Sequence, residues 1–270
     1  MVAHRGASEI APEHTLAAYQ QAILDGADAL ECDVRLTRDG VLVCVHDRRV
    51  ERTSNGRGVV SSLELADLAE LDFGYWHGGA IESPTEDIEE SDTEEPDWDR
   101  TSVLTLARLL ELVTSSPRPF GLAIETKHPT RYAGLVEHSL TELLRRYGLL
   151  RPRSERSMVR VMSFSALGLR RVHALAPGLP TVLLLARLRP PYRLGTLPPR
   201  VPIAGPSMSL VRRTPQYVDR AHAAGNAVHV WTVNDPADVD LCLALGVEAI
   251  ITDRPRHVLA QIGRSRDASV

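Results

Sequence analysis

The chain has 270 residues, of which 43% are hydrophobic, so it can bury a large core and we expect one domain over residues 1–270. None of its apolar runs approaches the ~20 residues that a bilayer span requires, which argues against stable membrane association. The net charge is −4, and the arginines of the segments around 145–160 and 187–213 are scattered and do not form a stripe with aromatic residues, so we expect no nucleic-acid partner.

The charge is unevenly distributed along the chain. Residues 82–99 hold ten acidic residues and no Lys or Arg, so this segment carries a charge of −10. Because the whole chain carries −4, the rest of the chain carries +6. This segment has two prolines and no apolar periodicity, which predicts a flexible acidic insertion. A solvated loop without a task of its own is the favoured interpretation.

Cys32, Cys44 and Cys242 all stand in apolar contexts, which predicts buried thiols in a reducing compartment. A strand-like run follows Met1 almost directly and leaves no room for a signal peptide. We therefore expect a cytoplasmic protein.

Strand-like runs alternate with helical patterns along the chain. The expected strands are 2–4, 29–36, 119–126, 158–164, 181–185, 201–208, 227–233 and 249–252, with a return strand at 41–46. The expected helices are 13–26, 104–114, 130–147, 165–176, 214–225 and 236–246. Eight strands separated by helices, without a Gly-rich nucleotide-binding turn, predict an α/β fold, a (β/α)8 TIM-type barrel with a hairpin and loop segment inserted after the second strand. In such a barrel the chemistry lies at the carboxyl ends of the strands.

The second strand carries two acids on one face. Side chains alternate along a strand, so Glu31 and Asp33 point together, opposite to the apolar residues between them. Adjacent buried carboxylates repel each other and lose hydration unless a cation lies between them. We interpret them as ligands of a hard divalent ion such as Mg²⁺ or Ca²⁺. Solvated acids on an exposed edge strand are the alternative.

The Asp39-Gly40 pair separates two β-rich runs and predicts a hairpin. A two-residue turn at this pair, or one residue earlier, brings His46 opposite Glu31 or Asp33. The acids and the histidine are therefore expected to meet.

Glu125 and Lys127 share a face at the end of the third barrel strand. Lys127 is the only lysine among 31 basic residues, which suggests an ammonium fitted to a confined phosphate oxygen, unless chance put it there. Near the ends of the last two strands, Trp231 is either a wall of the pocket or core, and Asn234 or Asp235 is expected to cap the next helix. Asp253 is expected to orient Arg5 or neighbouring backbone.

Taken together, these motifs resemble the glycerophosphodiester phosphodiesterase family. The matching strings are His4-Arg5-Gly6-Ala7, Glu13-His14-Thr15, Glu31-x-Asp33-Val34, Thr37-x-Asp39-Gly40, Val45-His46-Asp47, Arg52-Thr53-x-x-Gly56, Glu125-x-Lys127, Trp231-Thr232-Val233-Asn234 and Thr252-Asp253-x-Pro255. One departure is that the family usually has Asn where this chain has His14, which is expected either to support the site or to lie on a helix surface.

The resemblance implies a barrel hydrolase that cleaves small glycerophosphodiesters to glycerol 3-phosphate and an alcohol, using Mg²⁺, Ca²⁺ or Mn²⁺. The implied metal ligands are Glu31, Asp33 and Glu125, and the implied acid and base are His4 and His46. The same resemblance assigns the phosphate to Arg5 and Lys127, a substrate contact to Trp231, and supporting roles to Glu13 and Asp253.

Two other functions fit the same motifs. The first is a phospholipase-type barrel acting on lysophospholipid or phosphoinositide headgroups, which requires an apolar rim that the sequence does not reveal. The second is a binding barrel without activity, which would be expected to have lost one or more of the site residues.

Overall fold

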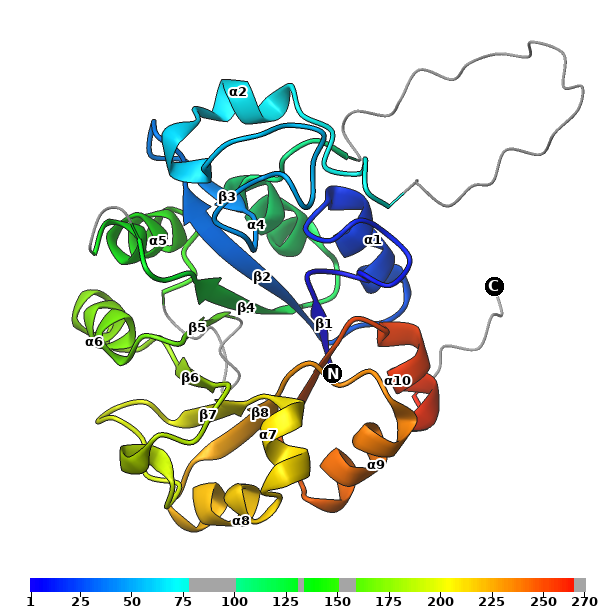
Figure 1. Ribbon diagram of the computed structural model, residues 1–270, viewed down its shortest axis with the longest axis vertical. Coiled ribbons are helices and arrows are strands. Elements are labelled where there is room, and N and C mark those ends of the chain that lie inside the picture. Colours follow the sequence, from blue (N-terminus) through cyan, green and yellow to red (C-terminus); the bar gives the residue numbers. More distant parts are fainter. Residues whose placement is uncertain (78–100, 131–133, 151–158, 265–270) are drawn as a thin grey trace, which may run out of the picture.

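The computed structural model describes residues 1–77, 101–130, 134–150 and 159–264. Within these residues, eight parallel strands close into a barrel with helices around it, so the predicted TIM-type fold is confirmed (Figure 1). In hydrogen-bonded order the strands are β1 (Val2–His4), β9 (Ala249–Thr252), β8 (Ala227–Val230), β7 (Ile203–Pro206), β6 (Thr181–Leu185), β5 (Val159–Ser163), β4 (Gly121–Thr126) and β2 (Ala29–Leu36). Pairing of β1 with β2 closes the barrel.

Each expected helix is present, with some ends moved by a few residues. The described helices are α1 (Leu16–Leu24), α2 (Leu65–Ala69), α4 (Leu106–Ser115), α5 (Leu135–Arg146), α6 (Ala166–Leu175), α7 (Met208–Arg213), α8 (Gln216–Ala223), α9 (Pro236–Ala244) and α10 (Pro255–Gln261), with 3₁₀ turns at Val60–Ser62 and Pro190–Tyr192. Three of them, α2, α7 and α10, are too short for the sequence to show a helical period. The expected strand 201–208 stops at Pro206 because Ser207 caps α7.

Strand alternation divides the core into two layers. Leu30, Cys32 and Val34 face outward and pack under the helices, as expected for the apolar residues of β2. A smaller set of apolar side chains, including Val182 and Ile203, packs inside the barrel. Glu31 and Asp33 lie on the inward face of β2, together with Ala29. The three cysteines are buried and not in disulfides, as predicted.

The hairpin after β2 differs from its prediction by one residue. Its loop has three residues, because the Thr37 amide donates to the Val41 carbonyl at 3.0 Å and Gly40 closes the turn with φ +83°. The return strand β3 (Leu42–Cys44) pairs Cys44 with Val34. Continued in this register, His46 would lie opposite Cys32, so the predicted placement opposite an acid was wrong. The strand ends before His46, and the following loop carries the side chain to the barrel mouth.

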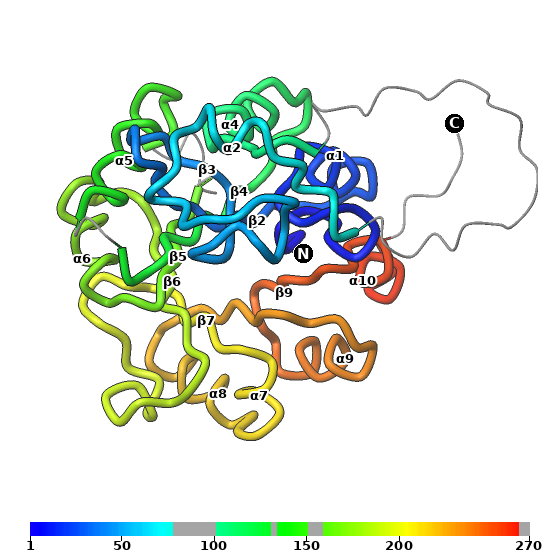
Figure 2. The backbone as a smooth tube through the Cα atoms, turned by 45° about the horizontal axis from the view of Figure 1, so that its top comes forward, coloured from blue at the N-terminus to red at the C-terminus, as the bar shows by residue number. Residues whose placement is uncertain are grey.

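The segment after β3 forms a small core of its own against the barrel. Val45, Val50, Val60, Leu68 and Phe73 pack together beside β3. Figure 2 shows this first part of the chain on one side of the barrel and β6 to β9 on the other. The predicted acidic insertion at 82–99 lies outside the described residues. No helix in the described part of the chain is long and apolar enough to cross a bilayer.

Candidate active site

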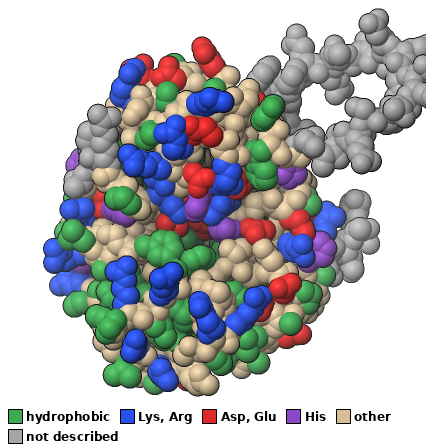
Figure 3. Space-filling model, in the orientation of Figure 1, with side chains coloured by type: hydrophobic (Ala, Val, Ile, Leu, Met, Phe, Trp, Pro, Cys, Tyr) green, Lys and Arg blue, Asp and Glu red, His purple; other side chains and the backbone are tan. Residues whose placement is uncertain are grey.

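The predicted site residues converge on a cavity of about 160 Å³ at the carboxyl ends of the strands. Figure 3 shows a hollow on this face where acidic, basic and histidine side chains gather beside a hydrophobic patch. The cavity is lined by His4, Arg5, Glu31, His46, Glu125, Lys127, Met162, Phe164, Leu184, Trp231 and Ile251. The remaining predicted residues, Glu13, Asp33 and Asp253, lie behind this lining and contact its members.

Three buried carboxylates form the centre of the site. Glu31, Asp33 and Glu125 each offer an oxygen, and these atoms lie within 4.8 Å of one another. The barrel register explains the cluster, because Asp33 pairs with Glu125 across β2 and β4, and Glu31 pairs with His4 across β2 and β1. All three side chains are at most 7% exposed. Such a set of hard oxygen donors fits a divalent cation such as Mg²⁺ or Ca²⁺.

The protonation of these acids reflects their crowding. Burial and the neighbouring Asp33 raise the pKa of Glu125 to about 8, and the same two causes raise that of Glu31. Burial opposes ionisation of Asp33, but His14 and Lys127 lower its pKa well below the usual range. The Lys127 ammonium lies 3.1 Å from Asp33 and 2.9 Å from Glu125. Lys127 therefore offsets part of the negative charge of the cluster.

Arg5 is held by several contacts just after β1. Its backbone has φ +57°, an unusual left-handed conformation, and its amide donates to Glu31 Oε2 at 3.1 Å. The guanidinium lies 3.0 Å from Glu13 and 3.1 Å from Asp33. Because both backbone and side chain are fixed, Arg5 presents a positive charge at the edge of the acidic cluster without rearrangement.

His4 is oriented by Asp253. Its Nδ1 lies 2.6 Å from Asp253 Oδ1, and its Nε2 faces the cavity, 4.0 Å from Glu31. Asn234 fixes Asp253 in turn by donating to its carboxylate at 2.6 Å and accepting from its amide at 3.0 Å. The expectation that Asp253 orients Arg5 was wrong, because the end of β9 pairs with β1 beside His4. Of the two residues expected to cap the next helix, Asp235 and not Asn234 occupies the cap position of α9.

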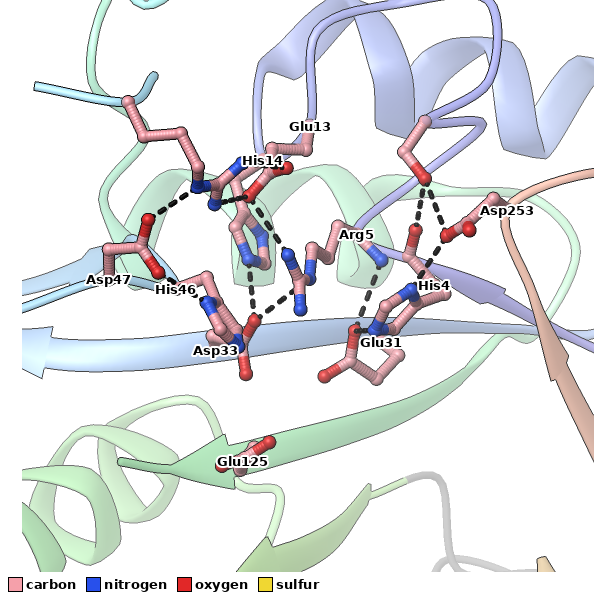
Figure 4. A network of polar contacts seen from close by, with 12 residues as sticks. His4, Arg5, Glu13, His14, Glu31, Asp33, His46, Asp47, Glu125 and Asp253 are labelled. Atoms are coloured by element: carbon pink, nitrogen blue, oxygen red, sulfur yellow. Dashed lines mark hydrogen bonds and ion pairs between the residues drawn. The ribbon is translucent and has the colours of Figure 1, made fainter. Parts of the chain in front are cut away.

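His46 belongs to a second network that also reaches Arg5. The His46 Nδ1 lies 2.7 Å from Asp47, and burial is the main cause that lowers the His46 pKa to about 4. The Nε of Arg52 pairs with Asp47, and its Nη1 and Nη2 donate to Glu13 at 2.8 and 2.7 Å. Figure 4 shows these contacts above β2, with Glu125 approaching from β4. Sequence reasoning assigned no role to Arg52 or Asp47, although both stand in the matched motifs.

The opposite wall of the cavity is apolar. Phe164 and Trp231 meet edge to face with ring centroids 5.5 Å apart, and the indole nitrogen donates to the Gly205 carbonyl at 2.7 Å. Trp231 thus lines the cavity instead of lying wholly in the core. Phe164 is 44% exposed and lies at the mouth. Sequence reasoning missed it because it stands alone after β5, outside any recognisable motif.

Residues 4–257 match the glycerophosphoryl diester phosphodiesterase family. The chain belongs to this family. It is 46% identical to the "Probable glycerophosphodiester phosphodiesterase 1" of Mycobacterium tuberculosis, over 98% of this chain and 93% of that protein. It is 34% identical to the glycerophosphodiester phosphodiesterase of Bacillus subtilis, over 94% and 83%.

A similar solved structure is that of an Oleispira antarctica phosphodiesterase in complex with its product sn-glycerol-3-phosphate. The TM-score is 0.78 at 25% identity, covering 97% of this chain and 96% of that one. The predicted family and the predicted phosphodiester hydrolase are confirmed.

His14 departs from the residue that the family usually has, and its place in this member is now clear. It is 5% exposed, so its prediction as a helix surface residue was wrong. Its Nε2 lies 2.9 Å from Asp33 and its Nδ1 lies 2.8 Å from the Tyr19 hydroxyl. Burial lowers the pKa of His14. The ring therefore fixes the orientation of Asp33 from behind and does not face the cavity.

Proposed function

We propose that this phosphodiesterase hydrolyses glycerophosphodiesters to glycerol 3-phosphate and an alcohol, with the help of a divalent metal ion. The observation that carries this proposal is the buried cluster of Glu31, Asp33 and Glu125 beside two oriented imidazoles. The named activities of the relatives and the glycerol 3-phosphate in the similar structure support the substrate class.

The three carboxylates would hold the ion, with Mg²⁺, Ca²⁺ and Mn²⁺ as candidates. Two observations support this fit. The donors are carboxylate oxygens, and the pKa values of Glu31 and Glu125 are raised because their ionisation is unfavourable unless a nearby cation compensates the charge. A bound divalent ion supplies Lewis-acid stabilisation of the charge on a phosphoryl group.

The protein groups around the cluster divide the remaining work. Arg5 and Lys127 would neutralise the phosphate oxygens, which otherwise repel an incoming nucleophile. His4 and His46 would supply one base and one acid, each worth roughly 10²–10⁴ in rate. Asp253 and Glu13 support these groups through their contacts with His4 and Arg5. We further infer one domain over 1–270 and a cytoplasmic location, the latter from the buried thiols.

The direct test is an assay of glycerol 3-phosphate release from glycerophosphocholine and a panel of related diesters. We expect turnover that EDTA abolishes and that Mg²⁺, Ca²⁺ or Mn²⁺ restores. His46→Ala should lose most of the activity, whereas His138→Ala, on the exposed surface of α5, should keep it. Absence of turnover on every diester, with each of the three ions supplied, would refute the proposal.

One observation favours a second candidate, a lysophospholipid substrate. Phe164 is partly exposed at the mouth, directly beside Trp231, and so provides the apolar edge that the sequence did not reveal. Hydrolysis of lysophosphatidylcholine would yield lysophosphatidate and choline, so released choline is the product to measure for both substrates. A lipid substrate requires faster choline release from lysophosphatidylcholine than from glycerophosphocholine.

A further inference from the structure

A second, larger cleft opens beside the catalytic cavity. Its volume is about 280 Å³, and it lies between the 3₁₀ turn at Val60–Ser62 and the start of α5. Lys127 lines both spaces, so they adjoin at the ammonium proposed to contact the phosphate. A diester has two substituents on its phosphorus. A site that holds the phosphate at Lys127 therefore has this cleft available for one of them.

The charged side chains of the cleft are all cationic. Arg35 follows Asp33 by two residues on β2, so it projects from the same face one step nearer the mouth. Its Nε and Nη2 donate to the His46 carbonyl at 3.0 and 2.7 Å. Arg48 lines the cleft from the loop after β3 and is exposed. Among the described residues, no carboxylate lies within ion-pair distance of Arg35 or Arg48, and none lines the cleft.

Placing cations together without an anion costs electrostatic energy, and a bound anion would remove that cost. Arg48 repels the charge of Arg35, whereas Asp33, Glu125 and Asp47 attract it from outside the lining of the cleft. Guanidinium groups bind phosphate and carboxylate with paired hydrogen bonds. Val60, Pro129 and Val136 supply apolar surface next to these charges. The lining thus combines a hydrocarbon wall with two guanidinium groups.

We propose that this cleft binds the alcohol substituent of the diester and selects alcohols that carry an additional anionic group, such as a phosphate monoester. This proposal rests on the proposed glycerophosphodiester hydrolysis. A quaternary ammonium alcohol such as choline is disfavoured, because its recognition requires aromatic faces or carboxylates, and the described lining has neither. Arg48 and Arg35 are the specificity-determining residues.

The experiment compares two substrates that differ only in one phosphate group. Glycerophosphoinositol and glycerophosphoinositol 4-phosphate are hydrolysed by the metal-loaded enzyme, and kcat/KM is measured from glycerol 3-phosphate release. We expect the phosphorylated substrate to be preferred by at least about tenfold at low salt, with the ratio falling as NaCl screens the arginines. Equal kcat/KM values for the pair would overturn the inference and leave the proposed function intact.

Substitutions then test whether the cleft is responsible. In Arg48→Gln the ratio of the two kcat/KM values should fall at least about fivefold. Arg49→Gln is the matched control, because Arg49 is exposed, pairs with Glu51 and does not line the cleft, so its ratio should equal that of the wild type. A ratio unchanged in Arg48→Gln, or lowered equally in Arg49→Gln, would refute the assignment. Failure to hydrolyse any diester would instead refute the proposed function, and this inference with it.

Discussion

The two sides of the catalytic cavity are built from different parts of the chain and by different forces. The polar side comes from β1, β2 and β4 and the loops that follow β1 and β3, and it is held by ion pairs and charged hydrogen bonds. The apolar side comes from β5, β6, β8 and β9 and is held by packing, as in the contact of Phe164 with Trp231. This division suits a substrate that is charged at phosphorus and carries a carbon skeleton.

The two sides of the cavity are expected to contribute differently to kcat and to KM. Charged groups that act on the phosphoryl group contribute mainly to kcat, whereas apolar contacts to unreactive atoms contribute to binding in the ground and transition states alike. Substitutions on the polar side should therefore lower kcat, and those on the apolar side should raise KM.

The largest effect is expected from Glu125→Gln. Loss of one anionic oxygen would weaken binding of the proposed ion, and because such an ion contributes several kcal/mol to the transition state, kcat should fall by at least about 100-fold. Isothermal titration with Mg²⁺ should show weaker binding independently of activity. Glu70→Gln, an exposed acid at the end of α2, is the control. Unchanged Mg²⁺ affinity would remove Glu125 from the metal site.

A smaller loss is expected from Arg52→Met, which cuts the connection between Glu13 and Asp47. Arg5 and His46 then lose part of their orientation, so kcat should fall on the order of tenfold with KM changed much less. Arg52→Lys should recover only part of the loss, since an ammonium cannot span both carboxylates as the guanidinium does. A variant with wild-type kcat would show that the network is only structural.

On the apolar side, Phe164→Ala should raise KM and leave kcat within about twofold. An aromatic contact is worth ~0.5–1.5 kcal/mol, which corresponds to a rise in KM of roughly 2- to 12-fold. The KM of Phe164→Leu should lie between that of Phe164→Ala and that of the wild type. A drop in kcat without a change in KM would contradict the division between the two sides.

The smallest effect on activity is expected from His229→Gln, because His229 is a buried residue of β8 that does not line the cavity. Burial lowers the pKa of His229 to about 4, and Arg160 acts in the same direction. Between about pH 6.5 and 4 the unfolded chain therefore binds a proton that the folded state rejects, so stability falls as pH decreases through this window, by roughly 2–3 kcal/mol. Urea unfolding at pH 7 and pH 4.5 should show a weaker pH dependence in His229→Gln than in His138→Gln, an exposed control.

The strand order and the acidic cluster were predictable because alternation along β2 and β4 fixes which side chains face inward. Contacts made by loops were not predictable, since nothing local indicates that Arg52 reaches Glu13 or that Asp253 meets His4. The predicted hairpin register was wrong by one residue, because an Asp-Gly pair is compatible with both two-residue and three-residue turns. Phe164 gave no signal, as a lone aromatic residue after a strand is equally compatible with core.

The bridge made by Arg52 has a consequence for solution conditions. The Arg52 side chain is 45% exposed, yet it pairs with both Glu13 and Asp47. These two carboxylates in turn contact Arg5 and His46. Dissolved salt weakens exposed ion pairs far more than buried contacts. Salt should therefore weaken the ion pairs of Arg52 and, with them, the positioning of Arg5 and His46. Catalytic activity should decline at salt concentrations that leave the folded barrel intact.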